Sequence, residues 1–328
     1  MNANRTLTQL NLLGSSPQFT QSCTLIHKFS RVDATVLIEG ETGTGKEVAA
    51  RALHYLGKRS GQAFIPVNCG GLPESLIESE LFGHERGAFT DAKSASPGLV
   101  SEADGGTLFL DEVDSLSMKA QAALLRFLQD KTYRRVGSGV TRQADVRIVV
   151  ASNASLEKLV DARQFRRDLL YRLNVLVLRM PPLRERQDDA LELAQVFAER
   201  FSDQYRMARK SLHPNLIALI RQHDWPGNVR ELENVVHRQF LLCEDGETQL
   251  GAALATAAVL PLLQDFKSAK ARAISDFERR YVQDTLKQSD GNLSQAARLA
   301  GQERSAFGKL ARKYGVEEKI ASTATPEG

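Results

Sequence analysis

Hydrophobic positions in the first 180 residues form two kinds of pattern. Short apolar or β-branched runs with little polar alternation occur at residues 34–40, 64–68, 107–112, 146–153 and 174–180. Such runs are typical of strands that are buried on both faces of a parallel sheet. The stretches between them have helical spacing, as in residues 117–130, where apolar positions recur every three or four residues. This alternation predicts an α/β sandwich with a central parallel sheet.

The pattern changes after residue 180, where the strand signals stop. Residues 188–243 are predicted to be helical, with a break at the sequence HDWPGN. Residues 246–265 have weak signals for either element and contain Pro261, so a linker is expected there. The predicted organisation is an N-terminal extension (1–11), an α/β subdomain (12–180), a helical lid (181–245), a linker (246–267), a helical C-terminal domain (268–316) and a disordered tail (317–328).

The positive charge of the chain is concentrated at its C-terminal end. Residues 266–328 hold 12 Lys and Arg against 8 Asp and Glu, a net +4, whereas the whole chain carries +3. This excess makes nucleic acid a candidate partner of the C-terminal unit. No apolar run approaches the ~18 residues of a membrane span, and no signal peptide is recognisable at the N-terminus. Three widely spaced cysteines argue against a C-x-x-C metal site and favour a cytoplasmic protein.

The clearest chemical signal is GETGTGK at residues 40–46, directly after the first predicted strand and before a helical stretch. It fits the G-x-x-x-x-G-K pattern, in which backbone N–H groups surround phosphates and the lysine reaches the outer ones. The predicted nucleotide-binding residues of this segment are Gly40, Glu41, Thr42, Gly43, Thr44, Gly45, Lys46 and Glu47. Glu47 replaces the usual Ser or Thr that binds Mg²⁺, so the metal would depend more on other groups. The alternative is a glycine-rich surface turn.

A pair of carboxylates ends the third predicted strand. The sequence TLFLDE places Asp111 and Glu112 at the carboxyl end of this strand, where open α/β sheets bind ligands. Asp111 is expected to hold Mg²⁺ through water, and Glu112 is expected to polarise the water that attacks ATP. The alternative is an acidic pair at a strand end without a catalytic role.

Further segments resemble the AAA+ domain of bacterial enhancer-binding proteins, which activate RNA polymerase carrying sigma-54. The resemblance covers about residues 12–245. LFGHERGAFTDA is similar to that family's GAFTGA loop, FRRDLLYRLNV to its arginine-finger segment, and PPLRER and WPGNVRELENVV to its lid signatures. The resemblance implies an AAA+ P-loop domain with a helical lid, an ATPase that uses ATP and Mg²⁺, and assembly into a hexameric ring. No N-terminal regulatory domain is expected ahead of residue 12.

The GAFTGA-like loop is the segment that would contact sigma-54, with Phe89 and Thr90 as the matching contact residues. An exposed apolar tip is useful to a protein that binds a partner. The alternative is that Phe89 anchors a hairpin in the core. Asp91 stands where the family has its second glycine, and an aspartate tolerates fewer backbone angles and adds a negative charge. A family member that acts without sigma-54 is therefore a second possibility.

The resemblance assigns roles to five other residues. Asn68 matches the switch asparagine that hydrogen-bonds the catalytic glutamate, here Glu112. Asn153 matches sensor I and Arg230 matches sensor II, both of which bind nucleotide. Arg166 and Arg172 match the arginine fingers, which stabilise charge on the nucleotide of the neighbouring subunit. The alternative for any single arginine is a solvated helix face.

The C-terminal unit, residues 269–316, is predicted to form three helices and resembles a Fis-type helix-turn-helix domain. Its first helix carries Ile274, Phe277, Tyr281 and Val282 on one face, which predicts a dimer contact. In the expected recognition helix, Arg304 and Ser305 would approach base edges, and Lys309, Arg312 and Lys313 would bind phosphates. The alternative is a solvated basic helix in an oligomerisation domain.

Together these signals predict a DNA-bound, ring-forming ATPase that remodels sigma-54 RNA polymerase from an enhancer-like site on double-stranded DNA. The first alternative is a DNA-binding regulator of the same fold that acts without sigma-54 and uses nucleotide mainly as a ligand. A generic AAA+ helicase or loader is a second alternative, against which the Phe-Thr loop and the helix-turn-helix argue.

Overall fold

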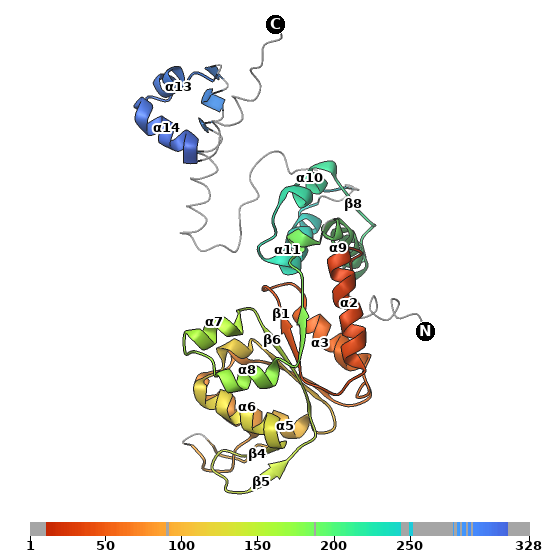
Figure 1. Cartoon of the computed structure of the whole chain (residues 1–328). Helices are drawn as coiled ribbons and strands as arrows, with labels where there is room; N and C mark the ends of the chain where they lie inside the picture. Colours follow the sequence, from red (N-terminus) through yellow and green to blue (C-terminus); the bar gives the residue numbers. More distant parts are fainter. Residues whose placement is uncertain are drawn as a thin grey trace. The chain divides into compact units, whose positions relative to one another are not determined.

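The computed structural model falls into two compact units, Met1–Thr256 and Ala257–Gly328, each with its own hydrophobic core (Figure 1). It describes residues 11–89, 92–186, 188–243, 249–251, 278, 281–282, 284–286, 288–289 and 291–313, with only the backbone of Glu74 and Ser75.

The first unit is built on a five-stranded parallel sheet with strand order β2-β3-β6-β1-β7. Its strands are β1 (Val36–Glu39), β2 (Phe64–Asn68), β3 (Thr107–Asp111), β6 (Arg147–Ser152) and β7 (Leu176–Arg179). These are the five predicted runs, so the predicted parallel sheet is confirmed. The central strands β3, β6 and β1 are almost wholly buried, whereas the edge strands β2 and β7 are largely half-buried or exposed. Burial on both faces is therefore a property of the central strands alone.

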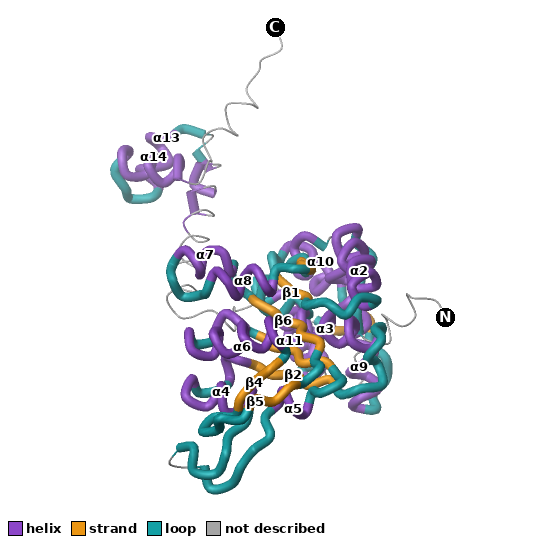
Figure 2. The backbone as a smooth tube through the Cα atoms, turned by 60° about the horizontal axis from the view of Figure 1, so that its bottom comes forward, coloured by secondary structure: helices purple, strands orange, loops and turns teal. Residues whose placement is uncertain are grey.

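Helices cover both faces of this sheet (Figure 2). One face packs on α2 (Pro17–Ser30) and α3 (Lys46–Tyr55). The other face packs on α4 (Glu74–Phe82), α5 (Leu99–Glu102), α6 (Met118–Asp130), α7 (Leu156–Asp161) and α8 (Arg167–Leu173). Two single turns, η1 (Cys69–Gly71) and η2 (Val113–Ser115), follow β2 and β3 at their carboxyl ends.

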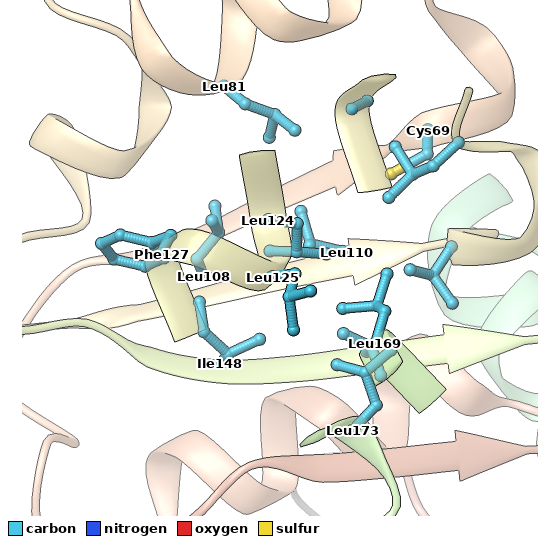
Figure 3. Packing of buried hydrophobic residues seen from close by; sticks show 14 of the residues in the cluster. Cys69, Leu81, Leu108, Leu110, Leu124, Leu125, Phe127, Ile148, Leu169 and Leu173 are labelled. Atoms are coloured by element: carbon cyan, nitrogen blue, oxygen red, sulfur yellow. The ribbon is translucent and has the colours of Figure 1, made fainter. Parts of the chain in front are cut away.

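The packing of α6 shows how the predicted helical spacing becomes a core. Ser117 caps its start by accepting a hydrogen bond from the N–H of Ala120. Leu124 and Leu125 then point at Leu108 and Ile148 of the sheet, together with Leu169 and Leu173 of α8 (Figure 3). The sheet, α6 and α8 thus share one apolar cluster.

A short antiparallel hairpin, β4 (Thr132–Arg134) with β5 (Thr141–Gln143), lies between α6 and β6. It was not predicted, because both strands are three residues long and rich in polar side chains. The loop that connects its two strands hydrogen-bonds through Val136 to the start of the GAFTGA-like loop.

The lid consists of η3 (Leu183–Glu185), α9 (Asp189–Tyr205), α10 (Pro214–Gln222) and α11 (Asn228–Leu241). The expectation of no strands in this region is wrong in one detail, since β8 (Ser211–Leu212) pairs in parallel with β9 (Gln249–Leu250). Trp225, in the predicted break, is 2% exposed and its indole N–H donates to the carbonyl of Ile220 at 3.0 Å. No helix in the described parts of the chain is long and apolar enough to cross a membrane.

The second unit contains α13 (Leu293–Leu299) and α14 (Arg304–Lys313), joined by a turn in which Gly301 has φ +64°. Asn292 caps α13 by accepting from the N–H groups of Ser294 and Gln295. The predicted dimer contact is corrected at Val282, which is 2% exposed inside the core of this unit, whereas Tyr281 is 42% exposed. Ile274 and Phe277 lie outside the described residues.

Candidate functional site

The predicted phosphate-binding loop joins β1 to α3 at the carboxyl edge of the sheet. Gly43 and Gly45 have φ values of +80° and +95°, which side-chain-bearing residues rarely adopt. A Cβ on Gly43 would also collide with the carbonyl oxygen of Gly227 in the lid. The loop is held by Thr44, whose hydroxyl donates to the carbonyl of Glu41 at 2.8 Å.

Lys46 is the first residue of α3 and is only 8% exposed. Its ammonium donates to the carbonyls of Gly40 (2.7 Å) and Glu41 (3.1 Å). Burial lowers the pKa of Lys46 below its usual value, while Asp111 and the other carboxylates beyond β3 oppose this shift. A buried cation whose partners are mainly carbonyls can exchange them for phosphate oxygens.

Asp111 and Glu112 stand at the end of β3, near Lys46. Asp111 accepts a hydrogen bond from the N–H of Glu112 at 2.9 Å, and burial raises the pKa of Asp111. Glu112 adopts the left-handed conformation, with φ 54° and ψ 47°, which is uncommon for a residue with a side chain. A Cβ on Gly70 would clash with the Glu112 carboxylate, so the absence of a side chain at Gly70 makes room for it.

Asn68 ends β2 in register with Asp111, but its side chain is occupied elsewhere. Its Oδ1 accepts a hydrogen bond from the N–H of Gly71 at 3.0 Å and so caps η1. No hydrogen bond between Asn68 and Glu112 occurs among the residues that the structure describes. The residue that lies against Glu112 is Gly70, which sequence reasoning did not single out.

Two other predicted nucleotide ligands differ in their surroundings. Asn153 is exposed directly after β6, at the same edge of the sheet as Asp111. Glu47 is exposed on α3 and forms an ion pair with Arg51 at 2.7 Å. This ion pair is the ordinary i, i+4 contact of a solvated helix face, and nucleotide binding by Glu47 stays a prediction.

The lid contacts the phosphate-binding loop through Asn228, which is 0% exposed and has φ +54°. Its Nδ2 donates to the carbonyl of Thr42 (3.0 Å) and to Glu41 Oε2 (3.2 Å), and its Oδ1 accepts from the N–H of Leu183 (2.8 Å). The N–H of Val229 donates to the carbonyl of Gly43 at 3.0 Å. The sequence predicted a role in the WPGNVREL segment only for Arg230.

Arg230 follows two residues later and is exposed, with its Cβ 3.2 Å from the Cβ that Gly43 would carry. Arg184 reinforces the same junction, because both of its terminal nitrogens bind the Glu41 carboxylate at 2.7 and 2.8 Å. The hydrogen bond from Arg184 lowers the pKa of Glu41. The loop and the lid are therefore joined by both charged and buried polar contacts.

The two predicted arginine fingers lie at the two ends of α8. Arg166 immediately precedes the helix, and its guanidinium pairs with Asp168 at 2.7 and 3.0 Å. Arg172 is exposed in the last turn of α8. The surface around Arg166 also exposes Tyr171 (71%) and Met118 (47%), which line a shallow depression of about 490 Å³.

The GAFTGA-like loop leaves the domain through a narrow neck. His84 and Ser96 exchange two backbone hydrogen bonds of 3.1 and 2.9 Å, and Gly83 and Gly98 pass so closely that a Cβ on either would clash with the other strand. The neck also bonds to Val136 in the β4–β5 loop, which accepts from Glu85 and donates to Gly83. Phe89 is half-buried, and its ring contacts His84 at 5.0 Å rather than the domain core. Thr90 and Asp91 lie outside the described residues.

The recognition-helix prediction places its residues on α14. Phe307 is 1% exposed and Leu310 is half-buried, as expected for the inner face. The five predicted DNA contacts, Arg304, Ser305, Lys309, Arg312 and Lys313, are all exposed. Lys313 pairs with Glu278 at 3.0 Å.

Comparison with known proteins agrees with this arrangement. The family model of the sigma-54 interaction domain matches residues 12–179, an AAA+ ATPase lid domain matches residues 184–257, and a Fis-family bacterial regulatory domain matches residues 273–313. The chain belongs to the sigma-54 interaction domain family. Its fold is an AAA+ P-loop domain with a helical lid, followed by a Fis-type helix-turn-helix, as the sequence predicted.

Relatives of this chain include proteins named as transcriptional regulators. It is 42% identical to ZraR of Salmonella typhimurium over 89% of this chain and 66% of ZraR. It is 42% identical to AlgB of Pseudomonas aeruginosa over 92% of this chain and 67% of AlgB. A crystal structure of NtrX from Brucella abortus in complex with ATP has a TM-score of 0.69 and 30% identity, covering 95% of this chain and 72% of NtrX. The chain thus spans about two thirds of the length of these relatives.

The residues present fit a nucleotide and a divalent cation. The cradle of loop glycines, the buried Lys46 ammonium and the N-terminus of α3 suit a polyphosphate. Asp111 and Glu112 offer carboxylate oxygens, and no group of three or more His, Cys, Asp or Glu side chains poised for a metal occurs in the described chain. Mg²⁺ suits such a site, because it is commonly bound through one or two carboxylates, waters and substrate phosphates.

Proposed function

We propose that this protein hydrolyses ATP and uses the energy to remodel RNA polymerase carrying sigma-54 while bound to an upstream site on double-stranded DNA. The observation that supports this most is that one unit combines three features. A phosphate-binding loop faces Asp111 and Glu112, the lid bonds directly to that loop through Asn228, and a narrow-necked loop carries Phe89 outward.

In the proposed reaction, a bound Mg²⁺ would supply positive charge that offsets the charge on the phosphates of ATP during hydrolysis of the β–γ phosphoanhydride bond. Lys46 exchanges its carbonyl partners for the outer phosphate oxygens. Asp111 binds the metal through water, and Glu112 orients and polarises the attacking water. Arg230 approaches the phosphates from the lid, and Asn228 fixes the position of the lid relative to the loop.

Arg166 and Arg172 are proposed to complete the site of a neighbouring subunit. Arg166 is half-buried directly before α8 and Arg172 is exposed in its last turn, and neither has a hydrogen bond or ion pair with the phosphate-binding loop among the described residues. A head-to-tail ring, hexameric in this proposal, follows from that arrangement. The exposed Tyr171 and Met118 beside Arg166 suit such an interface. In the second unit, α14 is proposed to enter the major groove, with Arg304 and Ser305 nearest the bases.

The proposal is tested by ATP-dependent open-complex formation with purified sigma-54 RNA polymerase, comparing wild type with Glu112→Gln and Asp91→Gly. Promoter opening by wild type that is lost in Glu112→Gln supports remodelling driven by hydrolysis. The second candidate function, regulation without sigma-54, is favoured by Asp91. It prevails if wild type fails to open promoters and Asp91→Gly succeeds.

A further inference from the structure

We propose that Gln121 is a positioning residue for Arg166. It fixes the backbone of Arg166 relative to the turn that follows Glu112. This inference rests on the proposed function, in which Arg166 completes the ATP site of a neighbouring subunit. Gln121 lies in the first turns of α6 and is 0% exposed. It is a buried polar side chain on the helix that also contributes Leu124 and Leu125 to the apolar cluster.

The amide of Gln121 makes three hydrogen bonds to backbone groups. Its Nε2 donates to the carbonyls of Leu116 (2.8 Å) and Gln164 (3.0 Å). Its Oε1 accepts from the N–H of Arg166 (2.9 Å). Both donor hydrogens and one acceptor position are therefore used, which is the condition under which a buried amide is tolerated.

These bonds reach from Gln121 to a segment 43 to 45 residues further along the chain. Leu116 ends the turn η2, which begins directly after Glu112, and its N–H donates to the carbonyl of Val113. Gln164 and Arg166 precede α8. Satisfied polar networks of this kind fix one arrangement of a core more sharply than apolar packing does.

The backbone of Arg166 is fixed, whereas its guanidinium can change its ion-pair partner. Its N–H is bound by buried Gln121, whereas its guanidinium is held by Asp168, an ion pair whose side chains are 36% and 51% exposed. A surface pair of this kind is weak and can be replaced by phosphate oxygens of a neighbour. The position of the guanidinium in a ring is therefore set by the backbone from which it extends, and that backbone is fixed by Gln121.

The first test compares ATPase activity of Gln121→Met with that of Gln129→Met. Methionine keeps the length of glutamine but lacks the oxygen and the nitrogen of its amide. Gln129 is an exposed residue on the same helix. Misplacement of a catalytic group by ~1 Å can cost up to ~100-fold, so about a tenfold loss or more is expected for Gln121→Met. Gln129→Met should match wild type, and an unchanged Gln121→Met would overturn the inference.

Mixing experiments then distinguish a finger defect from a general one. Lys46→Ala subunits lack a working nucleotide site but can donate a finger, and Arg166→Ala subunits have the reverse defect. Mixed rings of these two should recover ATPase activity, and failure to recover would remove the trans-acting finger itself, which belongs to the proposed function. With recovery established, the inference is tested by placing Gln121→Met in either partner.

Gln121→Met subunits mixed with Lys46→Ala subunits should recover activity, because the latter supply intact fingers. The double variant Lys46→Ala/Gln121→Met should fail to rescue Arg166→Ala subunits. Rescue by the double variant, or failure of the first mixture, overturns the inference. Either result would show that Gln121 does not act through the Arg166 finger.

Discussion

At the scale of single residues, the candidate site depends on a few buried polar groups with several partners each. Asn228 is the clearest case, because one side chain bonds to the phosphate-binding loop, to the segment that enters the lid and to its own turn. Its left-handed backbone is one that asparagine tolerates better than most residues. Asn228 therefore helps to position Arg230, which follows it by two residues.

Asn228→Ala is predicted to weaken nucleotide binding and to lower the free energy of unfolding by about 2–4 kcal/mol. The loss combines an unsatisfied buried N–H at Leu183 with the strain of alanine in a left-handed conformation. Asn228→Gly is the matched variant, because it removes the side chain without the strain. Nucleotide titration and chemical denaturation should show Asn228→Gly to be the more stable of the two but equally weak in binding. Wild-type nucleotide affinity in both variants would remove Asn228 from the site.

At the scale of elements, the two residues of a buried ion pair in the lid hold the start of the domain through hydrogen bonds. Arg186 Nε binds Asp189 Oδ2 at 2.9 Å, with side-chain exposures of 2% and 1%. Asp189 also accepts from the N–H groups of Ser15 and Ser16, and Arg186 donates to the carbonyl of Leu13. The segment before α2 is thereby fixed to the first turn of α9.

Asp189→Asn is predicted to lower the free energy of unfolding by about 3–5 kcal/mol near neutral pH, because it leaves Arg186 buried without its anion. Asp188→Asn is the control, since the side chain of Asp188 is 84% exposed. Denaturant unfolding of both variants measures the difference. An equal effect in the two variants would contradict the role of the buried pair.

The same pair predicts a pH dependence. Burial raises the pKa of Asp189, but hydrogen bonds from Arg186, Ser15 and Ser16 outweigh burial and leave the pKa below its usual 3.8. A lowered carboxyl pKa stabilises the folded protein above the unfolded value and loses that contribution as pH falls through the folded value. The stability difference between wild type and Asp189→Asn should therefore shrink below about pH 4.

Helix α14 predicts two kinds of DNA contact that salt can separate. Arg304→Ala should cost ~1–3 kcal/mol at the cognate site and relax its sequence preference, because the residue is placed near base edges. Lys309→Ala should weaken binding to all sequences and reduce the slope of log K against log salt by ~1. Fluorescence anisotropy over a salt series measures both. A uniform effect of Arg304→Ala on every sequence would assign it to phosphate instead.

At the scale of the whole molecule, hydrolysis and partner contact are predicted to be separable. Thr90→Ala should leave ATPase activity unchanged and reduce sigma-54-dependent transcription by about tenfold or more, the equivalent of a contact worth ~1.4 kcal/mol. Parallel ATPase and transcription assays test this on one preparation. Retained transcription would mean that the loop tip is not the contact.

The sequence by itself determined the strand and helix pattern, the phosphate-binding loop, the carboxylate pair and the basic terminal helix. These features are local: each depends on periodicity, on a strand–loop–helix context or on charge within a few turns. For the same reason the boundaries of all five predicted strands came within about two residues of the observed ones.

Only the tertiary structure decided which groups meet. Asn228 reaches Thr42 across 186 residues, Gln121 reaches Arg166 across 45, and Ser16 reaches Asp189 across 173. It also turned Asn68 toward Gly71, placed Val282 inside its own domain and left the edge strands partly exposed. A buried amide or ion pair carries no periodic signal, because its partners are backbone groups and distant side chains that come together only when the sheet, helices and lid have packed.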